Sequence, residues 1–517
     1  MTFEIVFVLL SLLGMVAALI ADKMRPGMIL FSVVVLFLCA GILTPKEMLE
    51  GFSNKGMITV ALLFLVSEGI RQSGTLGQVI KKLLPQGKTT VFKAQLRILP
   101  SVAFISAFLN NTPVVVIFAP IIKHWAKSVN LPATKFLIPL SYVTILGGIC
   151  TLIGTSTNLV VHGMILEAGF EGFSMFELGK VGIFIAIAGI IYIFLFSKRL
   201  LPDACPDTAV PDEEVEEGEK LHRVEAVLGA RFPGINKKLK DFNFQRHYGA
   251  EVKEIKTRNG QRFVSNLEEV VLHEGDTLVV MADDTFIPTW GESSVFVLLT
   301  NGNEPDTTGK KKRWFALLLL VLMIVGATVG ELPVTKEMFP DIKLDMFFFV
   351  SITTIIMAWT NLFPARKYTK YISWDILITI ACAFAISKAM VNSGVADSVA
   401  KFIIGLSDDY GPHVLLAMVF IITNLFTELI TNNAAAALAF PLALSISAQL
   451  GVSPTPFFVV ICMAASASFS TPIGYQTNLI VQGIGNYKFT DFVRIGLPLN
   501  IITFLISVIL IPLIWNF

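Results

Sequence analysis

The 517-residue sequence contains few charged residues, which excludes an ordinary soluble protein. Only 15% of its residues are charged and 54% are hydrophobic, whereas soluble globular domains carry about 25% charged residues. The mean hydropathy is +0.71. The net charge of +1 gives no reason to expect a nucleic-acid partner. We therefore expect an integral protein of the cell (inner) membrane, with the lipid bilayer as its main surroundings.

The sequence also lacks the residue groupings of enzymes and metalloproteins. Its five cysteines are scattered and none has the spacing of metal ligands, so we interpret them as small buried hydrophobic residues. No nucleophile and base form a recognisable motif, and we expect neither an enzyme nor an organic cofactor. Residues 1–20 lack the basic segment of a secretion signal, which indicates a first membrane span.

Apolar runs recur along the chain and predict an all-α membrane protein, because about 20 helical residues cross the hydrocarbon core. Full spans are expected near residues 3–20, 27–44, 57–72, 178–198, 314–331, 343–361, 371–391 and 495–516, and two longer, broken spans near 132–163 and 455–483. Residues 201–313 are charged and contain no run of that length. They predict a soluble insertion between two membrane repeats, at residues 1–200 and 314–517.

Two further apolar runs are interrupted at mid-length by amides, hydroxyls and prolines. Residues 109–113 read Leu-Asn-Asn-Thr-Pro, and residues 430–433 read Ile-Thr-Asn-Asn. Each polar group left unpaired in hydrocarbon costs several kcal/mol, so these residues need a purpose. We predict that they form the tips of two re-entrant hairpins, near residues 98–123 and 412–445, that together build one binding site.

Several landmarks recur at one constant shift in the residue numbering. The run Thr-Asn-Leu at 157–159 recurs at 477–479, and Ser67 recurs as Ser387, both at a shift of 320 (477 − 157 and 387 − 67). Each half is expected to have five full spans and one hairpin. Because five is odd, the second half is inverted relative to the first, which predicts two inverted-topology repeats.

Lysine and arginine concentrate in alternate predicted loops, for example at 71–97, 123–127, 310–313 and 366–370. Such residues are in excess in cytoplasmic loops. The pattern predicts a cytoplasmic insertion and places both termini outside.

The two predicted tips suit the binding of an anion together with small cations. N-terminal ends of half helices favour an anion, and unwound carbonyl groups favour a cation such as Na⁺. Neither tip contains lysine or arginine, so a divalent anion would depend on helix dipoles, amide N–H groups and co-bound cations. The alternative, asparagines that only join helices, is disfavoured by the duplication of the pair.

Two other features near the tips leave alternatives open. Gly147 and Gly148 favour a hinge or loop in a broken helical segment, with close helix packing as the alternative. Glu428 lies beside the second tip, and a carboxylate within a membrane segment is a functional candidate. Contact with water at the hairpin mouth is the alternative for Glu428.

At these residues the chain resembles the divalent-anion/sodium symporter (DASS) family of the ion transporter superfamily. Members carry a Ser-Asn-Thr motif at each hairpin tip and a Thr-Pro-type loop in the next helix. Residues 110–112 (Asn-Asn-Thr) and 431–433 (Thr-Asn-Asn) occupy the tip positions. Residues 150–151 (Cys-Thr) and 470–472 (Ser-Thr-Pro) occupy the loop positions.

The resemblance implies a substrate site flanked by sodium sites, so that two or more sodium ions travel with the anion. The first sodium site matches Ser106, Asn111 and the carbonyl group of Cys150. The second matches Thr427, Asn432 and the carbonyl group of Ser470. The implied substrate-binding residues are Asn111, Thr112, Thr151, Asn432, Asn433 and Thr471, and the supporting loop residues are Thr157, Asn158, Thr477 and Asn478.

The chain departs from family members that carry dicarboxylates. Those members often show Thr-Pro-Pro-Asn where this chain has Thr-Ser-Thr-Asn (155–158) and Tyr-Gln-Thr-Asn (475–478). The departure speaks against succinate as the substrate.

The insertion resembles a TrkA-C (RCK C-terminal) domain within residues 220–300. The matching runs are Arg-Phe-Pro-Gly at 231–234, Lys-Asp-Phe at 240–242 and Glu-Gly-Asp-Thr-Leu-Val-Val at 274–280. Residues 251–255 and 277–281 are rich in β-branched residues and predict strands. Members with such domains resemble bacterial sulfate permeases, which makes sulfate the first choice of substrate and citrate or a dicarboxylate the alternative. A homodimer held by this domain is expected, and the binding of an unknown ligand is its alternative role.

Together these features predict a sodium-coupled secondary transporter of a small divalent anion, in which a hairpin-bearing bundle crosses the membrane in an elevator-like motion. Two other classes stay open. A cation/proton antiporter of the same superfamily would need no anion. An ion channel gated by the TrkA-C-like domain is the other, although the sequence has no filter-like Thr-Val-Gly-Tyr-Gly run.

Overall fold

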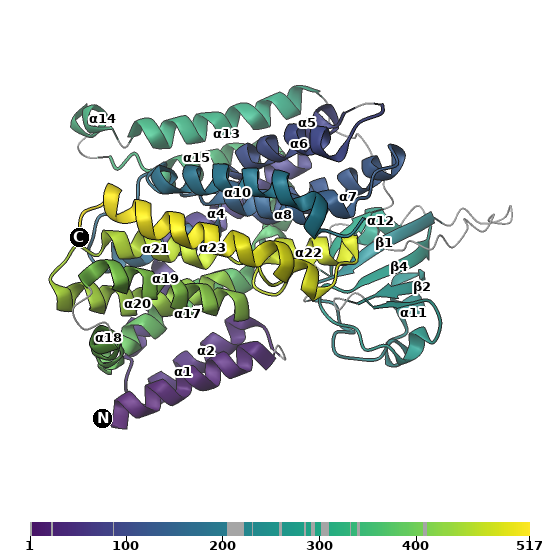
Figure 1. Ribbon diagram of the computed structural model, residues 1–517. Helices are drawn as coiled ribbons and strands as arrows, with labels where there is room; N and C mark the ends of the chain where they lie inside the picture. The colour runs from purple at the N-terminus through teal and green to yellow at the C-terminus, as the bar shows by residue number, and fades with distance from the viewer. Residues whose placement is uncertain are drawn as a thin grey trace, which may run out of the picture.

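The computed structural model describes residues 3–21, 24–85, 87–203, 222–229, 231–257, 261–283, 286–290, 295–300, 310–330, 332–338, 342–406 and 411–517. These residues form a helical bundle with a small sheet at one end (Figure 1). Both chain termini lie at the end of the bundle away from the sheet.

The first series of helices precedes the sheet in the sequence. Its members are α1 (Phe3–Ala21), α2 (Pro26–Cys39), α3 (Pro45–Glu50), α4 (Lys55–Gln72), α5 (Thr75–Leu83), α6 (Val91–Ser106), α7 (Asn111–Ser128), α8 (Thr134–Gly148), α9 (Ser156–Glu167) and α10 (Gly179–Leu200).

The sheet unit is built around five antiparallel strands in the order β3-β2-β4-β1-β5. The strands are β1 (His222–Leu228), β2 (Glu251–Lys256), β3 (Arg262–Phe263), β4 (Thr277–Ala282) and β5 (Phe296–Thr300), with short helices α11 (Phe244–Tyr248) and α12 (Phe286–Trp290). Both segments predicted as strands from their β-branched residues are strands, β2 and β4. The aromatic rings of Phe232, Phe242 and Tyr248 pack together in the core of the sheet unit.

The second series of helices follows the sheet. Its members are α13 (Lys310–Gly330), α14 (Pro333–Met338), α15 (Met346–Trp359), α16 (Tyr368–Tyr371), α17 (Trp374–Asn392), α18 (Val395–Leu406), α19 (Gly411–Leu429), α20 (Asn432–Leu450), α21 (Thr455–Ser466), α22 (Gln476–Gly485) and α23 (Phe489–Ile514).

The second series repeats the order and spacing of the first. The starts of α2 and α15 differ by the same shift of 320 (346 − 26), as do those of α6 and α19 (411 − 91) and of α9 and α22 (476 − 156). Contacts also recur across the two series, because α2 packs on α17 and α15 packs on α4. Helices α10 and α23 pack along each other.

Eight helices within the described ranges are long and apolar enough to cross a membrane. They include both arms of the second predicted hairpin, α19 and α20. Helix α10 exposes Ile183, Ile187 and Ile191, which share one helix face at intervals of four residues. Such an apolar outer face is stable in lipid and would be unfavourable in water.

The cysteines differ in their surroundings. Cys382 and Cys462 are buried, as expected of small hydrophobic residues, but Cys39 is exposed. Its position at the last residue of α2 places it beyond the buried stretch of that helix. Cys205 lies outside the described residues.

Candidate functional site

Each predicted tip is a short non-helical break inside the bundle, after which a new helix begins at an asparagine. Helix α7 begins at Asn111 after the break at 107–110, and α20 begins at Asn432 after the break at 430–431. Asn111 is buried. The first N–H groups of both helices have no partner within the helix and carry partial positive charge. The breaks therefore place two potential anion-binding helix ends in the interior.

The first tip is hydrogen-bonded to the other half of the chain. Ser106 Oγ donates to Asn111 Oδ1 at 2.7 Å, and Asn111 Nδ2 donates to the Tyr475 hydroxyl at 2.7 Å. The Tyr475 hydroxyl also lies 3.0 Å from Thr155 Oγ1. Tyr475 immediately precedes α22, so the tip of the first hairpin contacts the helix break between α21 and α22.

The second tip makes the reciprocal contact with the first half. Asn432 Nδ2 donates to Thr157 Oγ1 at 2.7 Å. Asn433 Oδ1 accepts hydrogen bonds from Ser156 Oγ at 3.3 Å and from Thr157 Oγ1 at 3.2 Å. Each hairpin tip is thus bound to the opposite half where α9 or α22 begins, and both sets of contacts lie near residues 155–157.

The two broken segments, 149–155 and 467–475, are held by equivalent hydrogen bonds. Asn158 Nδ2 donates to the Thr151 carbonyl at 2.9 Å, and Asn478 Nδ2 donates to the Thr471 carbonyl at 3.1 Å. The hydroxyl groups of both threonines donate to a backbone carbonyl of the adjacent hairpin. Both pairs are related by the shift of 320 (471 − 151 and 478 − 158), so the repeat extends to individual bonds.

Ser141 of α8 supports the second broken segment from the first half. Its hydroxyl lies 2.8 Å from Thr477 Oγ1 and 2.7 Å from Asn478 Oδ1. All three side chains are fully buried. These contacts hold the Thr477 and Asn478 side chains in place at the start of α22.

Gly147 and Gly148 form the last turn of α8, so the prediction of a hinge or loop at these residues is wrong. A Cβ atom on Gly147 would lie 2.1 Å from the carbonyl oxygen of Ala103 on α6, and one on Gly148 would lie 2.7 Å from Asn111 Oδ1. The glycines therefore allow the first hairpin to approach α8 closely. This agrees with the alternative interpretation of these glycines, close helix packing.

The other predicted site residues surround the same breaks. Thr112 Oγ1 donates to Gln476 Oε1 at 3.3 Å, and Thr427 Oγ1 donates to the Ala465 carbonyl at 2.7 Å. The carbonyl oxygen of Cys150 lies against Gly179 at the start of α10.

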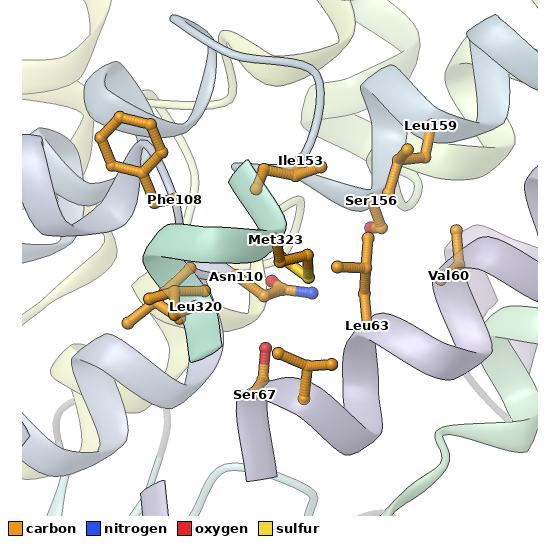
Figure 2. Close-up of a pocket in the computed structure, with 12 residues that line it drawn as sticks. Val60, Leu63, Ser67, Phe108, Asn110, Ile153, Ser156, Leu159, Leu320 and Met323 are labelled. Carbon is orange, nitrogen blue, oxygen red and sulfur yellow. The ribbon is translucent and has the colours of Figure 1, made fainter. Parts of the chain in front are cut away.

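A small cavity lies between the first tip and helices α4 and α13 (Figure 2). Its polar lining consists of Ser67, Asn110 and Ser156, and its remaining lining is apolar. Figure 2 shows the Asn110 amide in the middle of this group, between Met323 and Ser67. The cavity has a volume of about 10 Å³, which is enough for about one water molecule. A larger solute needs the tip and α4 to separate.

The sheet unit contacts two helices that begin at the site. Lys123 of α7 forms an ion pair with Glu225 of β1, with 2.9 Å to each carboxylate oxygen. Gly275 before β4 lies against Leu479 of α22. Burial alone raises the pKa of Glu225, but the nearby Lys123 and Lys256 ammonium groups outweigh it and hold the pKa at about 2. The sheet unit is therefore joined to both helices by charge and packing.

Comparison with known proteins agrees with this geometry. The family model described as "Citrate transporter" matches residues 16–446 and 338–517. The chain belongs to the citrate transporter family. It is accordingly a multi-pass membrane transporter of the DASS kind, and its family consists of transporters rather than enzymes.

Three relatives of this citrate transporter family member are also named as transporters. An "Uncharacterized transporter sll0640" of Synechocystis sp. is 30% identical, over 94% of this chain and 93% of the relative. The "Probable sodium/sulfate cotransporter 3" of Chlamydomonas reinhardtii is 23% identical over 93% of this chain and 85% of the relative. "Sodium/sulfate cotransporter 2" of the same alga is 31% identical over 54% of this chain and 31% of the relative.

Sequence reasoning missed the residues that join the two halves of this family member. Tyr475 and Gln476 were visible only as departures from Thr-Pro-Pro-Asn, and nothing in the sequence showed that they reach Asn111 and Thr112. Ser141 carries no counterpart at the shift of 320, where the chain has Ile461. The repeat therefore could not have identified it.

Proposed function

We propose that the chain is a sodium-coupled symporter of a small divalent anion, with sulfate as the substrate. Sodium ions bind first, near Ser106 with Asn111 and near Thr427 with Asn432. They order the tip amides and supply positive charge for the anion. The anion then binds between the tips, where Thr112, Asn433 and the threonines of the two broken segments (Thr151 and Thr471) provide hydrogen bonds.

One observation carries this proposal. Asn111 and Asn432, at the starts of two helices, reach into one network through Tyr475 and Thr157. Neutral amides and hydroxyls at helix N-termini suit an oxyanion. Because no lysine or arginine lies in either tip, co-bound cations are the source of compensating charge. The printed names of two relatives pair sodium with sulfate.

A second substrate, citrate, is favoured by the name of the matching family model. Sulfate remains the proposed substrate, because the names of two relatives pair sodium with sulfate.

In this proposal the two halves are inverted repeats, and the hairpins move with their broken helices relative to α4 and α17. The sheet unit faces the cytoplasm and both termini face outward. Figure 1 shows the sheet and the two chain termini at opposite ends of the helical bundle. The loop charges decide which end is cytoplasmic.

The test is uptake of radiolabelled sulfate into proteoliposomes with an inward sodium gradient, compared with choline in place of sodium. Unlabelled citrate and succinate compete in parallel samples. We expect sodium-dependent sulfate uptake that excess sulfate inhibits more strongly than citrate. Uptake of citrate but not of sulfate would mean that citrate is the substrate. Sulfate uptake without a sodium requirement would contradict coupling to sodium.

A further inference from the structure

We propose that Glu428 and Asn500 form an additional sodium site next to the second tip. Glu428 lies near the end of α19, one residue after Thr427, and Asn500 lies on α23. Asn500 Nδ2 donates to Glu428 Oε1 at 2.6 Å and to Ser470 Oγ at 2.9 Å. The inference rests on the proposed sodium symport and names a further ion of the same cycle.

Two buried oxygen atoms of this cluster have no hydrogen-bond donor within the described part of the chain. They are Glu428 Oε2 and Asn500 Oδ1. The Asn500 residue is 6% exposed. Buried acceptors are normally paired, and here both belong to groups already joined by a hydrogen bond. A cluster with surplus buried oxygen atoms is suited to a small cation, whose ligands are carboxylate and amide oxygens.

The surroundings of the carboxylate leave its charge uncompensated. Glu428 Oε1 accepts hydrogen bonds from the Ser470 N–H at 2.9 Å and from Asn500, and these donors are neutral. No ion pair of the described residues includes Glu428. An intramembrane carboxylate requires a compensating charge or a functional role, and a bound cation provides both.

The first half of the chain makes the equivalent loop contact without a carboxylate. Thr471 Oγ1 donates to the Glu428 carbonyl, and Thr151 Oγ1 donates to the carbonyl of Ala107. The same backbone bond is made beside an alanine in the first half. The Glu428 carboxylate is therefore present at the second tip and has no equivalent at the first.

Ser470 links the proposed site at Glu428 and Asn500 to the substrate site. Its N–H and hydroxyl groups contact Glu428 and Asn500, and its carbonyl group is the expected ligand of the second sodium ion. A cation on Glu428 would fix the broken segment 467–475, in which Thr471 contacts the anion. Loading of the site therefore prepares the substrate site.

The test measures sodium binding by its effect on thermal unfolding, because a ligand of the native state raises the midpoint. The full chain is purified in detergent and titrated with NaCl against choline chloride at constant ionic strength. In Glu428→Gln the amide oxygen still accepts the Ser470 N–H, but the negative oxygen is lost. We expect a smaller sodium-dependent rise and a sodium midpoint at least tenfold higher than in the wild type.

Asn500→Ala is the second variant and should shift the sodium midpoint in the same direction. Glu171→Gln, which removes an exposed carboxylate, is the matched control and should behave as the wild type. In proteoliposomes the ratio of ²²Na⁺ to sulfate taken up should fall by one in Glu428→Gln. A wild-type sodium titration in both site variants would overturn the proposal while leaving sodium symport intact. Absence of sodium-dependent uptake in the wild type would instead overturn the proposed function itself.

Discussion

The Asn111 amide donates a hydrogen bond of 2.7 Å to the Tyr475 hydroxyl, although 364 residues separate them in the sequence. In the conformation described, the Tyr475 hydroxyl thus occupies one of the two amide N–H donors that Asn111 could offer to an anion. Thr157 does the same for the donor of Asn432. Binding of substrate therefore competes with bonds within the protein.

Tyr475→Phe tests this competition. The variant keeps the ring and removes the hydroxyl, so the Asn111 amide loses a partner at a cost of about 1–3 kcal/mol to this conformation. We expect a KM for sulfate several-fold below that of the wild type, because less of the protein stays in the closed arrangement. Tyr368→Phe, at an exposed position, is the control. An unchanged or higher KM in Tyr475→Phe would show that the hydroxyl does not compete with the substrate.

Gly148→Ala tests the close approach of the first hairpin to α8. Its Cβ atom would lie 2.7 Å from Asn111 Oδ1, which forces the Asn111 side chain out of place. We expect sulfate uptake to fall at least tenfold while the protein remains monodisperse in detergent. Gly14→Ala on α1 is the matched control, since a Cβ atom there meets no atom within 4 Å. Equal loss in both variants would point to a general effect of replacing helix glycines.

The ion pair between Lys123 and Glu225 is expected to join the sheet unit to α7 over a wide range of pH. The folded-state pKa of Glu225 is about 2, below the ordinary 4.5. Its contribution to stability is therefore fully present above about pH 4.5 and is lost as pH falls towards 2. A double-mutant cycle of Lys123→Ala and Glu225→Gln measures the coupling from unfolding midpoints.

This coupling should be constant between pH 8 and pH 5 and should decrease below pH 4.5. Lys240→Ala paired with Glu269→Gln provides a control ion pair within the sheet unit. A coupling between Lys123 and Glu225 near zero at pH 7 would mean that the sheet unit is held to α7 by packing alone.

Much of the fold was predictable because lipid imposes strict rules on sequence. Apolar runs locate the helices, and the cost of unpaired polar groups makes interruptions such as 109–113 stand out. The constant shift between the two halves was visible in single landmarks, and it also appears in helix starts and in bonds such as Asn158 to Thr151 and Asn478 to Thr471.

The side chains that contact each other across the two halves were not predictable. A periodic pattern shows which residues break a helix, but it does not show which distant side chain faces the break. Tyr475 and Ser141 were identified only from their contacts with Asn111 and Asn478. The interpretation of Gly147 and Gly148 failed for a related reason, since only the position of Ala103 and Asn111 explains why glycine is needed there.

The most direct test of the central claim is sodium-driven uptake of ³⁵S-sulfate by Asn111→Ala and Asn432→Ala in proteoliposomes. Asn130→Gly, which replaces an exposed asparagine with positive φ, is the control and should transport as the wild type does. We predict that each site variant loses sodium-dependent uptake while its unfolding midpoint without sodium stays within a few degrees of the wild type. Uptake at the wild-type rate in either variant would contradict a substrate and ion site shared by the two tips.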